Sequence, residues 1–162
     1  MIPMSLVGVR VEVPSNQPIV LLRENDGQRY LPIFIGQPEA TAIVYALQGT
    51  ETPRPMTHDL FKSVLDDLGT KVMQVIITEL HDGTFFAEIE FARDGGTYRI
   101  SSRPSDAIAL AVRYGEPVPI FAHEEVLDEA GVLFEQDEDE EQIEQFREFL
   151  DQVRPEDFAA GD

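Results

Sequence analysis

The sequence predicts an α+β fold, with a mixed and mostly antiparallel sheet and three main helices, followed by an acidic extension. Segments whose hydrophobicity alternates with a period of two occur in two groups of three, and a segment of helical periodicity follows each group. The length of 162 residues suits one domain. The composition turns strongly acidic near residue 130, so we expect a domain over residues 1–130 and an extension over 131–162.

Three alternating runs precede the first helix and predict strands, over residues 5–13, 18–24 and 29–35. The sequence NDGQ between the second and third runs favours a hairpin turn. Residues 36–49 then predict a helix, because Pro38 suits a first helical turn and Gly49 suits a helix end.

The second half of the domain repeats this order. A helix is expected to begin near His58, with Thr57 as its N-cap and Gly69 as its terminator. Residues 70–101 alternate β-branched and aromatic side chains, with turns at HDG and RDGG, which predicts a three-stranded antiparallel meander. The sequence SRPSDAIALAVRY predicts the third helix, and VPIF predicts a short strand after it.

A short sequence similarity between the first and third predicted helices suggests an internal duplication. The sequences EATAIVYAL and DAIALAVRY each place an alanine directly after an acid and another alanine two residues later. Both follow a strand and a proline, so the domain would consist of two βββα halves.

The formal net charge is −19, and most of it lies near the C-terminus. Residues 124–162 contain 16 of the 31 acids but only 2 of the 12 Lys and Arg, so residues 1–123 are only mildly acidic. Binding of nucleic acid normally rests on Lys and Arg that neutralise phosphates, and the domain retains arginines for this purpose.

The extension is expected to form one amphipathic acidic helix. Its apolar residues recur at helical spacing, at Ile143, Phe146, Leu150 and Val153. This stripe would dock on the domain or on a partner. A further hypothesis is that the acidic extension inhibits binding of nucleic acid by occupying a basic site.

The chain contains no cysteine, which excludes disulfides, zinc–thiolate sites and thiol nucleophiles and favours a cytoplasmic location. No window approaches the roughly 20 apolar residues of a membrane-spanning helix. We therefore expect no association with membranes.

Each predicted helix carries an acid in its first turn, namely Glu39, Asp59 and Asp106. Helix N-termini have unpaired N–H groups and partial positive charge, so capping alone can explain each acid. The polar residues next to two of these acids favour a functional site as well. Arg54 and His58 lie beside the start of the second helix, and Arg103 and Ser105 lie beside the start of the third. Arginine with hydroxyl groups binds phosphate, and carboxylates with histidine bind hard divalent cations.

The sequences LPIFIGQPEATAI, RPMTHDL and SRPSDAIALAVR, in this order, resemble the bifunctional nuclease family of bacteria and plants. The resemblance extends from residue 1 to about residue 130. It implies a mixed α and β domain that self-associates, with nuclease activity on DNA and RNA. The polar positions shared within the family correspond to Glu39, His58, Asp59, Arg103, Ser105 and Asp106.

The leading hypothesis is a metal-dependent nuclease that acts on DNA or RNA. Glu39, Asp59 and Asp106 would be catalytic and bind Mg²⁺ or Mn²⁺. His58 would act as a general base or as a further ligand.

Arg54, Arg103 and Ser105 would contact the substrate in this hypothesis. The alternative is a non-enzymatic oligomeric module, for binding or regulation, in which the same polar residues cap helices and cross-link the fold. Under both hypotheses we expect a homo-oligomer, as a dimer or larger.

Overall fold

The computed structural model describes residues 1–133, and the helix expected in the extension lies outside the described residues. The elements in chain order are β1 (Ile2–Glu12), β2 (Gln17–Glu24), β3 (Arg29–Phe34), α1 (Gln37–Leu47), α2 (Thr57–Asp67), β4 (Lys71–His81), β5 (Thr84–Arg93), β6 (Gly96–Ser102), α3 (Pro104–Ala111), β7 (Ile120–Ala122), α4 (Glu124–Ala130) and β8 (Val132–Leu133). The predicted α+β class is confirmed. Within this part of the chain, no helix is both long and apolar enough to cross a membrane.

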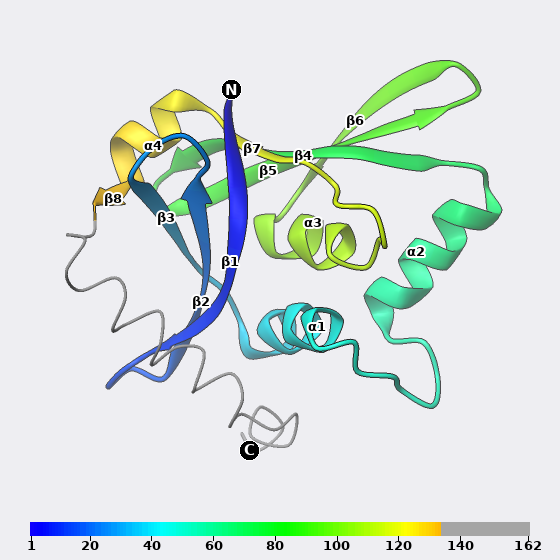
Figure 1. The fold of residues 1–162 in the computed structure, drawn as a ribbon, viewed down its shortest axis with the longest axis horizontal. Helices are drawn as coiled ribbons and strands as arrows, with labels where there is room; N and C mark the ends of the chain where they lie inside the picture. The colour runs from blue at the N-terminus through cyan, green and yellow to red at the C-terminus, as the bar shows by residue number, and fades with distance from the viewer. Residues whose placement is uncertain (134–162) are drawn as a thin grey trace.

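The strands of the described region form one sheet in the order β6-β5-β4-β7-β1-β2-β3-β8. β1 to β3 form one antiparallel meander and β4 to β6 form another. The short strand β7 joins them, because it pairs antiparallel with β1 and parallel with β4. Each meander leads into a helix, α1 or α3, which is the order expected of two βββα halves (Figure 1).

Two-residue turns fix the register of the second meander. Asp82 and Gly83 connect β4 to β5, and Asp94 and Gly95 connect β5 to β6, all four with positive φ between 47° and 76°. This is the conformation of a type I′ hairpin turn, for which Asp-Gly is strongly preferred. The turns predicted from HDG and RDGG are therefore confirmed.

Helices cover both faces of the sheet. α1 and α3 pack together beneath it, and α4 packs on the opposite face (Figure 1). The consecutive residues Val75, Ile76 and Ile77 of β4 are all buried, as expected for a strand covered on both sides. In α3 the alanines at positions 107 and 109 are completely buried, and their small side chains let the helix approach its neighbours closely.

Helix α2 stands at the edge of the domain and buries Leu65 alone among its residues. It begins at Thr57, with Met56 as the N-cap, so the expectation that Thr57 is the cap is wrong. The reason is the side chain of Asp59, whose Oδ2 accepts the Met56 N–H at 2.9 Å and so starts the helix one residue earlier.

Candidate active site

Arg103 joins the N-termini of α1 and α3. It is the N-cap of α3, and Pro104 follows in the first turn. Its Nε donates to Asp106 Oδ2 at 2.7 Å and its Nη2 to Asp106 Oδ1 at 3.1 Å. Its Nη1 donates to Glu39 Oε1 at 3.0 Å, so one guanidinium bridges carboxylates from two helix starts.

His58 reaches the same carboxylate from the first turn of α2. Its Nε2 lies 3.0 Å from Asp106 Oδ1, and its side chain is 14% exposed. An ionised carboxylate can only accept hydrogen bonds, so Nε2 carries the proton when the imidazole is neutral. Nδ1 is then the nitrogen with a lone pair. We call Glu39, His58, Arg103 and Asp106 the Arg103 cluster.

The charges of the Arg103 cluster stabilise one another. Burial alone would raise the pKa of Asp106, but hydrogen bonds from Arg103 and His58 outweigh burial and hold this pKa below its ordinary value. The carboxylates of Asp106 and Glu39 in turn raise the pKa of Arg103. Asp106 is therefore ionised at neutral pH and serves as an acceptor that orients its neighbours.

Asp59 lies apart from this cluster and holds α2 against α3. Its Oδ1 accepts from Arg113 Nε at 2.7 Å, in addition to the bond from Met56. The Arg113 side chain is only 6% exposed and also donates to the Ala109 carbonyl at 2.6 Å. Burial raises the pKa of Asp59, but the bonds from Arg113 and Met56 outweigh it and lower the pKa overall.

Arg113 is the residue that sequence reasoning missed. It lies seven residues after Asp106 and two residues beyond Ala111, the last residue of α3. No local signal in the sequence identifies Arg113 as the partner of Asp59, because the pair depends on how α2 lies against α3.

The other two expected substrate contacts differ in exposure. Arg54 is exposed on the loop before α2, where its carbonyl accepts from the Thr52 hydroxyl at 2.7 Å. Its guanidinium is not among the described ion pairs of the cluster. Ser105 is buried in the first turn of α3 and lines a hollow together with Arg103.

The three carboxylates expected to bind Mg²⁺ or Mn²⁺ do not gather around one point. Glu39 and Asp106 both accept from Arg103, whereas Asp59 accepts from Arg113. Over residues 1–133, no group of three or more His, Asp or Glu side chains is arranged to hold a metal ion. A cation can bind between Glu39 and Asp106 only after Arg103 moves away, so the arrangement does not fit a metal site.

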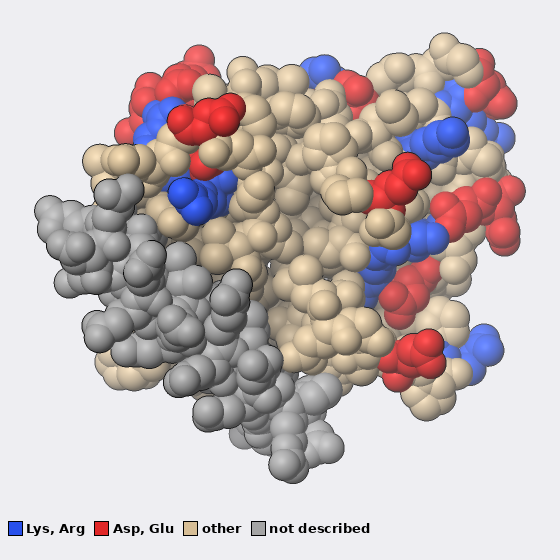
Figure 2. Space-filling view, viewed as in Figure 1, with Lys and Arg blue, Asp and Glu red and all other residues tan. Residues whose placement is uncertain are grey.

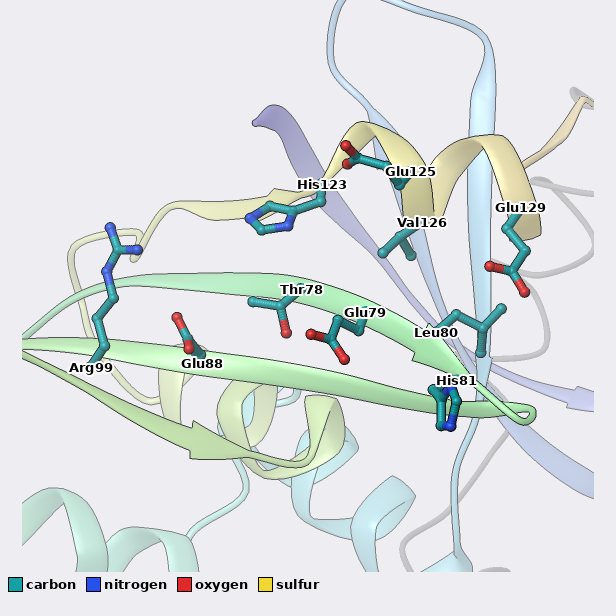
Figure 3. Close-up of a pocket in the computed structure, with 10 residues that line it drawn as sticks. All are labelled: Thr78, Glu79, Leu80, His81, Glu88, Arg99, His123, Glu125, Val126 and Glu129. Carbon is teal, nitrogen blue, oxygen red and sulfur yellow. The ribbon is translucent and has the colours of Figure 1, made fainter.

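Two surface hollows differ in charge. One of about 640 Å³ lies between β4, β5, β6 and α4 (Figure 3). Carboxylates from β4, β5 and α4 outnumber the one arginine in its described lining, Arg99, which pairs with Glu90 at 2.8 Å, and His81 and His123 also line it. Its acidic lining disfavours an anionic ligand. Another hollow, of about 430 Å³, lies beside the Arg103 cluster, and its described lining includes Arg103 and no acidic residue.

Comparisons with known proteins match most of the chain. Residues 20–135 match the Bifunctional nuclease domain. Uncharacterized protein MT1877 of Mycobacterium tuberculosis (strain CDC 1551 / Oshkosh) is 48% identical over 163 residues, which covers 96% of this chain and 96% of the relative.

Plant proteins match over a shorter region. Bifunctional nuclease 1 of Oryza sativa subsp. japonica is 29% identical over 105 residues, and Bifunctional nuclease 2 of Arabidopsis thaliana is 30% identical over 105 residues. Each match covers 63% of this chain and 32% of the plant protein. The chain thus spans about a third of the length of these relatives.

Replacement of Asp59 by alanine should destabilise the fold. The Asp59→Ala variant leaves the buried Arg113 without its carboxylate and removes the cap of α2, which should lower the free energy of unfolding by about 2 kcal/mol. Asp66→Ala is the matched control, because Asp66 pairs with Lys62 on the exposed surface of the same helix and should cost at most about 1 kcal/mol. Urea denaturation measures both, and equal losses would contradict the structural role of Asp59.

The contribution of Asp106 to stability should depend on pH. Its folded pKa is below the ordinary value of 3.8, so the ionised carboxylate stabilises the fold above that pH. This stabilisation is lost as the pH falls through the folded pKa. Urea denaturation should therefore show wild type more stable than Asp106→Asn near neutral pH, with the difference shrinking as the pH falls below 3.8. A difference that does not change with pH would contradict the assigned pKa direction.

Proposed function

The chain belongs to the bifunctional nuclease domain family, and on this premise we propose that it is a nuclease that hydrolyses DNA or RNA at the Arg103 cluster. The observation that carries the proposal is the bridge from Arg103 to Glu39 and Asp106, with His58 on the same Asp106 carboxylate. These groups supply a cation for phosphate and a histidine oriented by an acid.

Arg103 is suited to bind the phosphate. Of the five N–H donors of a guanidinium, three are used by Glu39 and Asp106, so two are left for a ligand. The side chain is 63% exposed, and two carboxylates fix its orientation. The N-termini of α1 and α3 add partial positive charge of about half a unit each, which offsets part of the negative charge of the carboxylates.

His58 is the proposed general base. Its Nδ1 would take a proton from a water molecule as the oxygen attacks phosphorus. The bond from phosphorus to the leaving oxygen then breaks, and this oxygen keeps the electron pair and takes a proton from solvent. Asp106 would stabilise the imidazolium that forms, as the acid does in other histidine–carboxylate pairs. Such a base contributes roughly 10² to 10⁴ in rate.

The requirement for Mg²⁺ or Mn²⁺ stays a prediction, as does the cytoplasmic location. No step is assigned to a metal, because two of the three expected ligands, Glu39 and Asp106, pair with Arg103, and the third, Asp59, pairs with Arg113. Inhibition by the acidic extension also stays a prediction, because residues 134–162 lie outside the described residues.

Cleavage assays test the proposal with variants purified in the same way. Single-stranded DNA and RNA are incubated with Mg²⁺, Mn²⁺ or EDTA. His58→Ala and Asp106→Ala should each lower the rate by about 100-fold or more, because they remove the base and the group that orients it. His81→Ala is the matched control, since His81 is exposed at the β4–β5 turn, and should cleave like wild type. Equal rates in all four proteins would indicate a contaminating nuclease and contradict the proposal.

A specific observation also favours the second candidate, an oligomeric module. Leu60, Val64 and Leu68 form an exposed apolar stripe along α2. Phe61, which is also exposed on α2, lines a shallow hollow together with Tyr98 and Ile100 of β6. Exposed apolar patches of this kind mark interaction surfaces.

We propose that a second copy of the chain covers this stripe. The charges around it are paired within each copy, as Lys62 with Asp66 at 2.6 Å and Arg93 with Asp94 at 3.3 Å. Basic and acidic atoms also lie side by side over the region of α2 and β6 (Figure 2). Two such patches can meet without an excess of like charge, although the whole chain is strongly acidic.

A charge placed on the stripe should break the assembly. Size-exclusion chromatography with light scattering should give at least twice the monomer mass for wild type and the monomer mass for Val64→Glu. Val13→Glu, at an exposed position in the β1–β2 connection, is the control and should assemble like wild type. A monomeric wild type, or a Val64→Glu variant that still assembles, would contradict the proposed interface.

A further inference from the structure

The hollow of about 430 Å³ beside the Arg103 cluster has the size of a small-molecule site, for which roughly 300 to 1,000 Å³ is typical. Four parts of the chain line it: the start of β2 at Gln17, the end of β3 with Gly36, the β4–β5 turn with the start of β5, and Arg103 to Ser105 at the start of α3. It is thus bounded by the same two helix starts that hold Glu39 and Asp106.

The lining of this hollow combines aromatic rings with one positive charge. Phe34, the last residue of β3, is 50% exposed, and Phe85 lines the hollow from β5 and packs against the core. Among the described residues that line it, Arg103 is the one charged residue. Gln17 and Thr84 add exposed polar groups at its edge.

Gly36 places the hollow directly against the cluster. A Cβ atom at this position would collide with the Glu39 carboxylate, so Gly36 both lines the hollow and lies directly against that carboxylate. Arg103 belongs both to the lining of the hollow and to the ion pairs with Glu39 and Asp106. A ligand in the hollow would therefore contact the guanidinium that we assign to the phosphate.

We propose that this hollow binds one unpaired base of a single-stranded nucleic acid, with Phe34 as the stacking surface. Bases stack on aromatic side chains while cations hold the backbone, which is the combination found here. A base within a duplex is paired and stacked on its neighbours, so it can enter a hollow of this kind only after it unpairs and unstacks, which weakens the binding of a duplex. The inference rests on the proposed function and narrows the substrate class to single strands.

The other described hollows fit a base less well. In the described lining of the hollow beneath α4, carboxylates outnumber the one arginine, Arg99, so the net negative charge repels the phosphates on either side of a base. The hollow between α2 and β6 also has aromatic residues, but Arg103, which we assign to the phosphate, does not line it. The hollow at Phe34 alone among these three joins an aromatic lining to the proposed phosphate site.

Binding of a fluorescein-labelled single strand of eight thymidines tests this inference by anisotropy. Phosphorothioate linkages and EDTA prevent cleavage during the measurement. Phe34→Ala should weaken binding about tenfold or more, which is the usual effect of removing one base–aromatic contact. Phe34→Tyr should retain binding. Phe86→Ala is the matched control, because Phe86 is 39% exposed and points to the opposite face of β5 from Phe85, and it should bind like wild type.

Each outcome separates this inference from the proposed function. Binding that depends on Phe34, with a duplex of the same sequence bound at least tenfold more weakly, would support the hollow as a base site even if the protein cleaves nothing. Normal binding by Phe34→Ala, or equal binding of single strand and duplex, would overturn it even if cleavage depends on His58. Because Phe34 is half exposed, its replacement should leave the fold intact. A thermal melting curve for each variant checks this.

Discussion

The arrangement of the polar residues depends on one interaction, the bridge of the Arg103 guanidinium between Glu39 and Asp106. The two carboxylates can share one arginine only because α1 and α3 pack side by side beneath the sheet. Completely buried alanines near both helix starts, Ala40 and Ala107, permit this close approach. Small residues in the core thus set the geometry of charged groups at the surface.

The protein uses arginine–aspartate pairs for two different purposes. Arg113 is buried and pairs with Asp59, which joins the start of α2 to the end of α3. Arg103 is largely exposed, and its remaining donors face no described protein acceptor. The buried pair of Arg113 and Asp59 therefore stabilises the fold, whereas the exposed pair of Arg103 and Asp106 is accessible to a ligand. An exposed arginine held by two carboxylates loses little conformational freedom on binding, which favours recognition of phosphate.

Local signals in the sequence predict much of this fold. Alternation of apolar and polar residues predicts the strands, and Asp-Gly predicts the turns at residues 82–83 and 94–95. A proline close to an acid predicts the starts of α1 and α3. The same signals identify Glu39, His58 and Asp106 as polar groups at helix starts. His58 contacts Asp106 directly, and Arg103 joins Asp106 to Glu39. The partner of Asp59 could not be predicted in this way, because it depends on how α2 lies against α3. The position of the α2 cap was missed because a side-chain bond from Asp59 decided it.

The imidazole N–H of His58 gives the most direct test of the claim that Asp106 holds this ring by Nε2 and leaves Nδ1 to accept a proton. The chain contains three histidines, so nitrogen-15 NMR can assign each ring. At a pH where the ring is neutral, an N–H signal protected from exchange should appear on His58 Nε2 in wild type and vanish in Asp106→Ala. A protected signal on Nδ1, or an Nε2 signal that survives in Asp106→Ala, would contradict this arrangement.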